Sequence, residues 1–467
     1  MTLENILNTR NYLSGYNVHR QEDREKMFQA IGINKIEDLF EQIPDILRLK
    51  KPLSLPKAMS EWKLENHLRD LAAKNLTLKT HLSFLGGGVY DHFIPATVDA
   101  ISNRGELLTS YTPYQPQMSQ GLLQILFEYQ KMISILLGLP AVNCSVYDGA
   151  TALAEGAWMA CVIKETKCII AADGIWPEYQ NVLNNYMKGR NVEIIYVNQD
   201  KETGLVDQTH LIEVNKNNKF ATILVQSPNK YGVLENLASL SEFAISNNAL
   251  FNLSTYPMAL GLLEAPGKQS VDIVTCEGQS LGIHLNAGGP YLGIMGTHKK
   301  YEEFLPGRLV GCNTDTDGNH FFSLIKEYRE QHVSRENATS HICSNQALQA
   351  VKAVVYLATL GENGFKELSL LNAQKAHYFQ EKLCAIAGVS LARKAPFFNE
   401  FCIKLPCLTD LFLNKLEEKN IFAGIKIGPY ELLIAVTEKH TREQLEYAAK
   451  VFSETIKTIH STQKDIL

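Results

Sequence analysis

Residues 272–293, DIVTCEGQSLGIHLNAGGPYLG, combine a short apolar run, a polar turn and a glycine-rich return. This order is typical of a strand that ends at a ligand site, where glycines let the backbone adopt conformations closed to other residues. The segment contains no lysine. Gln279 and Ser280 occupy the turn instead, and neither side chain can form a Schiff base. The segment predicts the architecture of a cofactor loop without its reactive residue.

A second candidate is the helix start in NCSVYDGATALAEGA, residues 143–157. Asp148 and Gly149 precede helix-forming residues, so free N–H groups and the positive end of the helix dipole would face the space in front. A phosphate is the usual ligand of such a cup. Asp148, however, would place a carboxylate in the same field, and Asp is a frequent helix cap. The sequence is therefore consistent with a helix cap and with an anion-binding site.

Hydrogen-bonding side chains gather in YTPYQPQMSQ, residues 111–120, where two prolines stiffen the loop. They are Tyr111, Thr112, Tyr114, Gln115 and Gln117. Ser119 could cap the helix that follows. The loop either lines a site or packs, fully hydrogen-bonded, on a neighbouring chain.

Basic residues cluster further along the chain. Arg308 lies beside a Pro-Gly turn, and Arg329, His332, Arg335 and His341 come just ahead of a helical segment. An arginine pair could bind a carboxylate or a phosphate in a bidentate manner. The same charges could equally form a solvated, salt-bridged face. No Ser/His/Asp or Cys/His set can be assigned from spacing, because such residues need not be close in sequence.

The elements that must position these residues alternate between strand and helix. Short runs rich in Val and Ile, such as TKCIIAAD, FATILVQSP and VDIVTCEG, are separated by helical stretches such as GATALAEGAWMACVIK. This alternation predicts an α/β fold with a mostly parallel sheet covered on both faces. We expect a helical N-terminal arm over residues 1–75, a large α/β domain over 76–330 and a small C-terminal α+β domain over 331–467. The helix in SNQALQAVKAVVYLATLG is expected to end at Gly361.

Composition excludes several classes of function. The 467 residues carry a net charge of −5 with acidic and basic residues interleaved, so a nucleic-acid partner is not expected. The apolar runs are shorter than a membrane span, and the N-terminus lacks a leader pattern, which favours a cytoplasmic protein. Nine cysteines lie far apart with no histidine at metal-ligand spacing, so we expect structural thiols and no metal.

Several motifs in chain order resemble one known family. They are FLGGGVYDHFIPATVD, YTPYQPQMSQGLLQILFEYQ, SVYDGATALAEGA, EGQSLGIHLNAGGPYLG, PGRLVG and REQHVSRENATSHICSNQAL. The chain is similar to subunit 1 of the decarboxylating glycine dehydrogenase, the P-protein of the glycine cleavage system. The resemblance implies a fold-type-I pyridoxal-phosphate-dependent transferase architecture, with a mostly parallel, seven-stranded-type sheet in a large domain and a small C-terminal α+β domain.

The resemblance also implies where the cofactor belongs. In this family two similar halves form one chain or two subunits, and this chain resembles the N-terminal half, whereas the cofactor lysine belongs to the other half. Gln279 and Ser280 stand at the lysine turn, and Asn252 stands where an acid would pair with the pyridine nitrogen. Asp148 and Gly149 stand at the phosphate end. We therefore expect pyridoxal phosphate to be held by a partner subunit, with no catalytic residue in this chain alone.

The same resemblance implies the partners. The complete enzyme decarboxylates glycine and passes the aminomethyl group to the lipoyl group of the H-protein. This chain is expected to pair with subunit 2, in an α2β2 assembly, and to be inactive alone. Its active-site-lining residues at the partner interface are expected to be Tyr111, Thr112, Tyr114 and Gln115, with Tyr90, Asp91 and His92 behind them.

Two departures from the family pattern and one alternative remain. Gln117 stands where an acidic residue is expected, and His341 stands where an asparagine is more usual. The alternative is an independent fold-type-I enzyme, of the cysteine desulfurase or amino acid decarboxylase type, that uses Lys299 or Lys300. Those lysines follow the glycine return by about ten residues and lie beyond the next strand.

Overall fold

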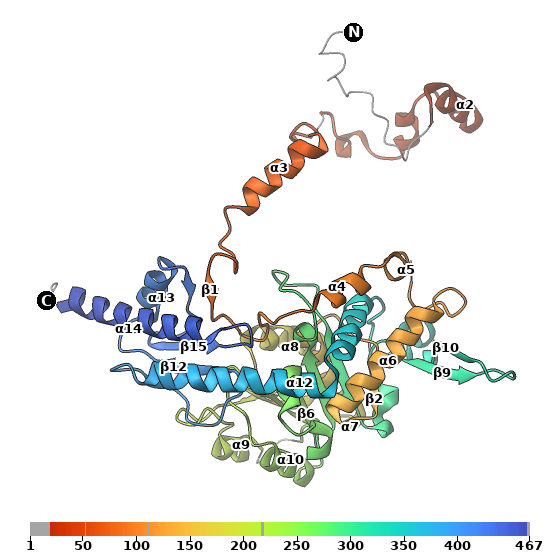
Figure 1. The fold of residues 1–467 in the computed structure, drawn as a ribbon. Helices are drawn as coiled ribbons and strands as arrows, with labels where there is room; N and C mark the ends of the chain where they lie inside the picture. The colour runs from red at the N-terminus through yellow and green to blue at the C-terminus, as the bar shows by residue number, and fades with distance from the viewer. Residues whose placement is uncertain (1–18, 52, 111, 216–218, 465–467) are drawn as a thin grey trace, which may run out of the picture. The chain divides into compact units, whose positions relative to one another are not determined.

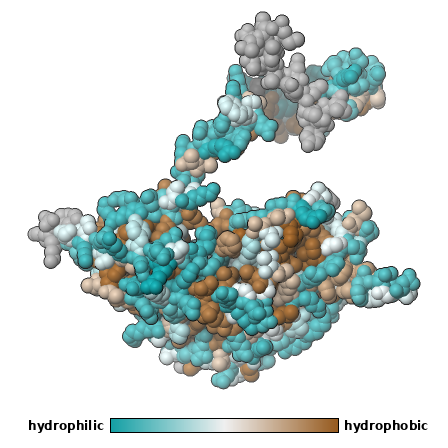
Figure 2. All heavy atoms as spheres, viewed as in Figure 1, coloured by the Kyte–Doolittle hydropathy of each residue, from teal (hydrophilic) through white to brown (hydrophobic). Residues whose placement is uncertain are grey.

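The computed structural model describes residues 19–51, 53–110, 112–215 and 219–464 (Figure 1). The chain divides into two compact units, residues 1–75 and 76–467. The helices of the first unit are α2 (Gln21–Ile31), η1 (Ile36–Phe40), η2 (Asp45–Leu47) and α3 (Glu61–Ala72). None of its described residues is buried, and apolar side chains such as Ile46 and Trp62 are exposed. Figure 2 shows that its surface is largely hydrophilic with some hydrophobic residues among them. The described part of this unit therefore has no hydrophobic core of its own.

A seven-stranded sheet organises the second unit. Its order is β2-β8-β7-β6-β5-β3-β4. The strands are β2 (Ala141–Val142), β3 (Cys168–Ala172), β4 (Glu193–Val197), β5 (Thr222–Ser227), β6 (Leu250–Thr255), β7 (Ile273–Glu277) and β8 (Gly293–Thr297). Strands β3 to β7 are parallel to one another, and β8 runs antiparallel to β7 and β2. The predicted mostly parallel, seven-stranded sheet is confirmed.

Successive strand residues face different cores, as the two-residue period of a strand requires. Ile170 and Val225 pack in one core with the helices α6 (Gln120–Leu137), α10 (Leu237–Ser246) and α12 (Ala347–Cys384). Ile169 and Leu224 pack in another with α7 (Gly149–Lys164) and α8 (Pro177–Gly189). Because both faces are covered, most residues of the strands are apolar on both faces.

The C-terminal part of the chain forms a smaller α+β layer with its own core. Its sheet has the order β11-β12-β15-β14, from β11 (Ser390–Leu391), β12 (Glu400–Lys404), β14 (Ile425–Gly428) and β15 (Glu431–Ala435). The helices α13 (Thr409–Glu417) and α14 (Arg442–Lys464) cover it. A short parallel pair joins β1 (Leu82–Ser83) to β13 (Ile421–Phe422). The predicted small α+β unit is thus present.

Helix α12 links the two layers and corrects one expectation. Figure 1 shows it running from α4 (Ala96–Ser102) and α6 to β12 and α14. Gly361, predicted to end the helix, has a left-handed φ of 63° and interrupts it, but a second helical stretch follows directly. Residues up to Phe365 pack in the large core and residues from Ala376 in the small one. The predicted domain boundary at residue 330 therefore stays a prediction.

Shorter elements complete the second unit. They are α5 (Gly105–Leu108), α9 (Gln208–Asn215), α11 (Gln331–Ser334), η3 (Pro257–Gly261), η4 (Pro266–Gln269), η5 (Gly278–Ser280), η6 (Lys299–Phe304), η7 (Glu327–Arg329), η8 (Arg335–Asn337) and an antiparallel hairpin of β9 (Val310–Thr314) and β10 (His320–Leu324). The sequence analysis had not predicted this hairpin. Among the helices that the structure describes, none is both long enough and apolar enough to cross a membrane.

Candidate functional site

The carboxyl ends of the parallel strands surround a small cavity, the position where open α/β sheets bind ligands. Its lining residues are Gly88, Tyr90, Trp176, Tyr179, Gln226, Pro228, Ser254, Thr255, Tyr256 and Glu277. They come from the ends of β5, β6 and β7, from the start of α8 and from the segment before α4. The cavity measures about 30 Å3. That volume holds a water molecule or two and no cofactor.

The Glu277 carboxylate fills the space in front of helix α7. Its Oε2 accepts a hydrogen bond from the backbone N–H of Gly149 at 2.9 Å. Its Oε1 accepts from the N–H groups of Gln279 and Leu292, both at 3.0 Å. Burial raises the pKa of Glu277 to about 7, because desolvation outweighs these three hydrogen bonds, which lower it. The structure thus places a carboxylate where the sequence analysis left an anion cup open.

Asp148 caps the same helix, as one of the two sequence interpretations proposed. Its Oδ1 accepts from the N–H of Thr151 at 2.7 Å. The first turn of α7 is therefore satisfied by two side chains of the chain itself, Asp148 and Glu277. Glu277 was not singled out in the sequence, although a carboxylate that ends a buried strand beside a helix start is a usable signal.

Gln279 occupies the lysine turn as a structural residue. It is 2% exposed, and its Oε1 accepts from the N–H of Tyr90 at 2.9 Å. Its Nε2 donates to the carbonyl oxygens of Tyr90 at 3.0 Å and Ile283 at 2.8 Å. Ser280 beside it is buried, and its Oγ has no hydrogen-bond partner among the described residues. Gln279 therefore ties the turn after β7 to the segment before α4.

Asn252 lies in the middle of β6 and is fully buried. Neither its amide nitrogen nor its amide oxygen has a hydrogen-bond partner among the described residues. A Cβ on Gly156 of α7 would lie 2.7 Å from the Asn252 Nδ2, so the helix packs directly against this side chain. The position predicted for an acid paired with a pyridine ring is closed by helix α7.

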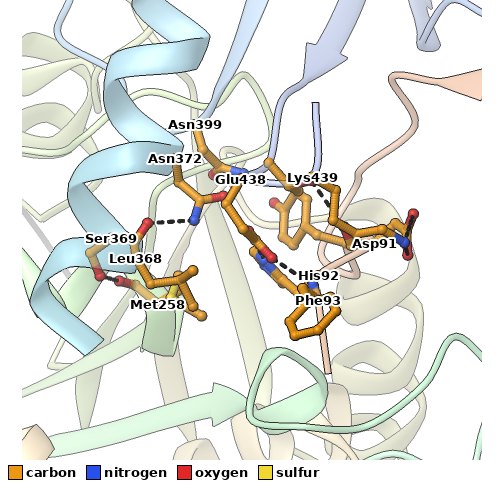
Figure 3. A network of polar contacts seen from close by, with 12 residues as sticks. Asp91, His92, Phe93, Met258, Leu368, Ser369, Asn372, Asn399, Glu438 and Lys439 are labelled. Carbon is orange, nitrogen blue, oxygen red and sulfur yellow. Dashed lines mark hydrogen bonds and ion pairs between the residues drawn. The ribbon is translucent and has the colours of Figure 1, made fainter. Parts of the chain in front are cut away.

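The segment with Tyr90, Asp91 and His92 joins the large and small layers. Tyr90 and His92 are buried, and the Tyr90 hydroxyl donates to Glu400 Oε2 at 3.1 Å. Asp91 forms an ion pair with Lys439 at 2.6 Å. His92 Nδ1 lies 2.7 Å from Glu438 Oε2 (Figure 3). The Nε2 of His92 contacts the Tyr256 hydroxyl.

The proline-stiffened loop has different partners. The Tyr114 hydroxyl donates to Asn345 Oδ1 at 2.5 Å, and the Arg308 guanidinium lies 5.5 Å from the centre of the Tyr114 ring. Ser119 does not cap α6 with its side chain; its Oγ donates to the Thr112 carbonyl at 3.0 Å. Thr112 and Tyr114 are half-buried, whereas Gln115 and Gln117 are exposed. Tyr111 lies outside the described residues.

Two arginines of the basic cluster have partners inside the chain. Arg308 is 9% exposed and forms an ion pair with Glu330. Arg329 donates to the carbonyl oxygens of Leu305 and Gly307. Burial lowers the pKa of Arg329 to about 10. These contacts favour the salt-bridged interpretation of the arginines. His332, Arg335 and His341 are exposed.

Cysteine and metal chemistry find no support in the residues described. All nine cysteines are free thiols. Within the described part of the chain, no group of three His, Cys, Asp or Glu side chains is arranged to hold a metal ion.

Solved structures with low sequence identity share the fold of this chain. A sphingosine-1-phosphate lyase from Burkholderia pseudomallei has the same fold, with a TM-score of 0.64 over 91% of this chain and 98% of its own, at 14% identity. A glutamate decarboxylase from Lactobacillus brevis gives the same score over 88% and 96%. The chain therefore has the fold-type-I architecture of pyridoxal-phosphate enzymes, as predicted.

The family follows from closer similarity. The model of the family described as "Glycine cleavage system P-protein" matches residues 15–452, and the chain belongs to this family. It is 41% identical over 438 residues to a "Probable glycine dehydrogenase (decarboxylating) subunit 1" of Desulforamulus reducens, covering 92% of this chain and 97% of the relative. The relative of the same name in Prosthecochloris aestuarii is 43% identical over 429 residues, 91% and 96% of the two chains.

A solved structure supports the same assignment. A glycine decarboxylase (P-protein) of the glycine cleavage system, in inhibitor-bound form, is similar to this chain with a TM-score of 0.87 and 37% identity. The similarity covers 94% of this chain and 99% of that one. The resemblance inferred from the motifs is confirmed.

Pyridoxal phosphate, which this fold family implies, does not fit the residues present. Glu277 and Asp148 occupy the helix start that would face its phosphate. Gln279 is held by three hydrogen bonds at the lysine position, and Asn252 offers no carboxylate to the ring nitrogen. The cavity at this place measures only about 30 Å3.

Lys299 and Lys300, the lysines of the alternative interpretation, lie at the opposite end of the strands from the cavity. Strand β8 is antiparallel to β7, so Gly293 pairs with Glu277 while Thr297 pairs with Ile273, at the opposite end. Both lysines are exposed, and the Lys299 ammonium pairs with Glu302 at 2.6 Å. Among the described residues, those that line the cavity include no lysine.

Proposed function

We propose that this chain is the first subunit of a decarboxylating glycine dehydrogenase, the P-protein of a glycine cleavage system. One observation carries the proposal: the chain matches relatives named as this subunit over at least nine-tenths of both chains. With a second subunit of the same fold, it decarboxylates glycine and transfers the aminomethyl group to the lipoyl group of the H-protein.

The partner subunit holds the cofactor in this proposal. Fold-type-I enzymes bind pyridoxal phosphate through a lysine, which supplies the covalent attachment. In this chain Gln279 stands at that turn with both ends of its amide hydrogen-bonded, and Glu277 fills the helix start. The lysine and the phosphate site are therefore assigned to the other subunit, and the chain alone is inactive.

This chain contributes the rim of the partner's active site. The supporting observation is the proline-stiffened loop. In it Tyr114 contacts Asn345 and Arg308, whereas Gln115 is exposed to solvent. Thr112, Tyr114 and Gln115 are assigned to contact with the partner. Tyr90 and His92 are buried with partners inside the chain, so we assign them to positions behind the contact surface. Asp91 forms its ion pair beside them.

The assembly follows from the pairing of similar folds. We assign an α2β2 assembly, in which two heterodimers are related by a two-fold axis, because two-fold symmetry is the commonest closed symmetry of soluble oligomers. The arm, whose described residues bury no core, offers apolar surface for such contacts. A cytoplasmic location is favoured by nine cysteines without a disulfide.

The cofactor assignment is tested by trapping. The purified chain is mixed with excess pyridoxal phosphate, reduced with borohydride and digested, and peptides are analysed by mass spectrometry. We expect no stoichiometric pyridoxyl-lysine on this chain, and one on subunit 2 treated in parallel. A stoichiometric adduct on a single lysine of this chain, Lys299 or Lys300 included, would overturn the assignment.

The subunit role is tested by activity in the reconstituted complex. This chain, subunit 2 and lipoylated H-protein are combined, and exchange of labelled bicarbonate into glycine is followed. We expect exchange only when both subunits are present. Replacing Gln115 by Ala should lower the exchange rate about tenfold, a loss of about 1.4 kcal/mol in transition-state stabilisation. Gln124→Ala, an exposed glutamine on the following helix, is the matched control with unchanged exchange. Exchange by this chain without subunit 2 would refute the role.

A further inference from the structure

We propose that the Glu277 carboxylate is a resident anion that replaces a ligand phosphate at the start of helix α7 and locks the surrounding loops without any cofactor. Beyond the subunit role, this contact would stabilise the loops around the start of α7 in a chain that binds no cofactor. It rests on the contacts of Glu277 and holds for whatever reaction the complete enzyme catalyses.

The three donors come from three different segments. Gly149 begins α7, Gln279 lies in the turn after β7, and Leu292 precedes β8. In a ligand-binding protein, backbone N–H groups of such loops converge on a bound phosphate. Here they converge on one carboxylate of the chain itself. Removing that carboxylate would leave three buried donors without partners, each of which is unfavourable in a low-dielectric interior.

Close packing shows that Glu277 is built into this position. A Cβ on Gly149 would lie 2.8 Å from the Glu277 Cβ and 2.4 Å from the Tyr179 hydroxyl. Only glycine lets the start of α7 approach the end of β7 this closely. The start of α7 and the end of β7 are therefore in direct contact at Gly149 and Glu277.

Glu400 provides a matched comparison inside the same molecule. It is 2% exposed, and burial raises its pKa to about 7, as for Glu277. It accepts one backbone N–H, from Gly87 at 2.8 Å, and its other oxygen accepts from the Tyr90 hydroxyl. A hydroxyl can reverse from donor to acceptor, whereas a backbone N–H cannot. An amide in place of the carboxylate is therefore tolerated at Glu400 and not at Glu277.

The first test uses this difference. Glu277→Gln and Glu400→Gln are compared by thermal unfolding of the full chain at about pH 8, where a carboxylate with a pKa near 7 is mostly ionised. The Glu277→Gln amide must direct an NH2 group at a backbone N–H, so we expect Tm to fall by about 3 °C or more. Glu400→Gln should stay within about 1 °C of the wild type. Equal Tm values for the two variants would overturn the proposal.

The second test replaces the anion chemically. Glu277→Ala deletes four heavy atoms, the same number that acetate supplies, and the space opens into the cavity that Glu277 lines. At about 100 mM acetate we expect the Tm of this variant to rise about 2 °C more than that of the wild type, as for a site with a millimolar Kd. Acetamide, the neutral isostere, and chloride at equal ionic strength should give no such rise. Glu400→Ala, whose side chain does not line the cavity, is the control variant.

Each outcome of the acetate experiment either supports or overturns the proposal. Acetate-specific stabilisation of Glu277→Ala supports the resident anion, and so does soluble expression of that variant only in acetate. Equal rescue by acetamide would overturn it, because the site would then need only a neutral acceptor. A folded Glu277→Ala protein without any response to acetate would overturn it too. If Glu277→Ala yields no soluble protein under any condition, the two glutamine variants decide.

Discussion

Two buried carboxylates, Glu277 at the end of β7 and Glu438 after β15, have pKa values shifted in opposite directions. Glu277 is held entirely by backbone N–H groups within the large layer. Glu438, which follows β15, pairs with His92 and accepts the Phe93 N–H, so it ties the small layer to the large one (Figure 3). Burial opposes ionisation of both. It raises the pKa of Glu277 to about 7, whereas His92 and Phe93 overcome it and lower the pKa of Glu438 to about 2.

The two carboxylates differ in whether backbone dipoles alone hold them. Three N–H groups position a carboxylate but do not offset the loss of its hydration, because each carries only a partial charge. An ionisable partner such as His92 does offset it. Glu277 therefore fills a space, whereas Glu438 links two layers through a titratable pair. The predictions below separate these two roles, starting from the largest expected effect.

Removing the Glu438 side chain should have the largest effect on stability. Glu438→Ala leaves His92 and the Phe93 N–H without their partner. The site is buried, because the His92 side chain is 2% exposed and the Glu438 side chain 7%. We expect the free energy of unfolding in urea to fall by about 3–5 kcal/mol. Glu454→Ala, at an exposed position of α14, is the control and should stay within about 0.5 kcal/mol of the wild type. A loss below about 1 kcal/mol would show that the Glu438 pair does not join the layers.

The pH dependence of stability should differ in sign between the two carboxylates. The folded-state pKa of Glu438 is lowered to about 2 from 4.5, so its contribution is present above about pH 4.5 and is lost as the pH falls toward 2. This gap corresponds to about 3 kcal/mol. Urea unfolding between about pH 2 and 8 should show a shallower acid loss in Glu438→Gln than in the wild type. An unchanged acid limb would contradict the pairing.

Glu277 should show the reverse slope. Its folded-state pKa is raised to about 7 from 4.5, so ionising the carboxyl group costs the folded state stability, and this cost grows as the pH rises from about 4.5 to 7. Glu277→Gln should remove this slope between about pH 4.5 and 7. The same stability difference from the wild type across that range would contradict the raised pKa.

Removing the hydroxyl on the other side of His92 should have an intermediate effect. Tyr256→Phe deletes the partner of His92 Nε2 in a buried position while keeping the ring. We expect a loss of about 1–2 kcal/mol in urea unfolding, since a buried ring nitrogen loses its hydrogen bond. Tyr430→Phe, at an exposed tyrosine, is the control. A loss as large as that of Glu438→Ala would mean that Tyr256, not Glu438, is the main partner of His92.

The neighbouring surface pair should have the smallest effect. Lys439 pairs with Asp91 next to Glu438, but the two side chains are 41% and 33% exposed. Solvent and salt screen such a pair, so Lys439→Ala should lower stability by less than about 1 kcal/mol, and less still at high salt. A larger loss would place the link between the layers at the surface and not in the buried pair.

Much of the fold was predictable from local patterns. The apolar runs at residues 168–172, 222–227 and 273–277 and the helix at 149–164 follow from composition alone, and Asp148 caps that helix as one interpretation proposed. The hairpin of β9 and β10 was missed, because its two short strands mix apolar and polar residues and show no regular alternation of buried and exposed positions. The helix beyond Gly361 was missed because the same glycine conformation that ends a helix can also join two.

The sequence by itself determined that the turn after β7 carries no amine, since Gln279 and Ser280 stand there whatever the fold. It also determined the alternation of strands and helices, because that pattern depends on neighbours along the chain. Only the tertiary structure decided what fills the vacated space. Glu277 meets Gly149, 128 residues away, and Gln279 meets Tyr90, 189 residues away. Such contacts depend on how strand ends and loops converge, which residue spacing does not encode.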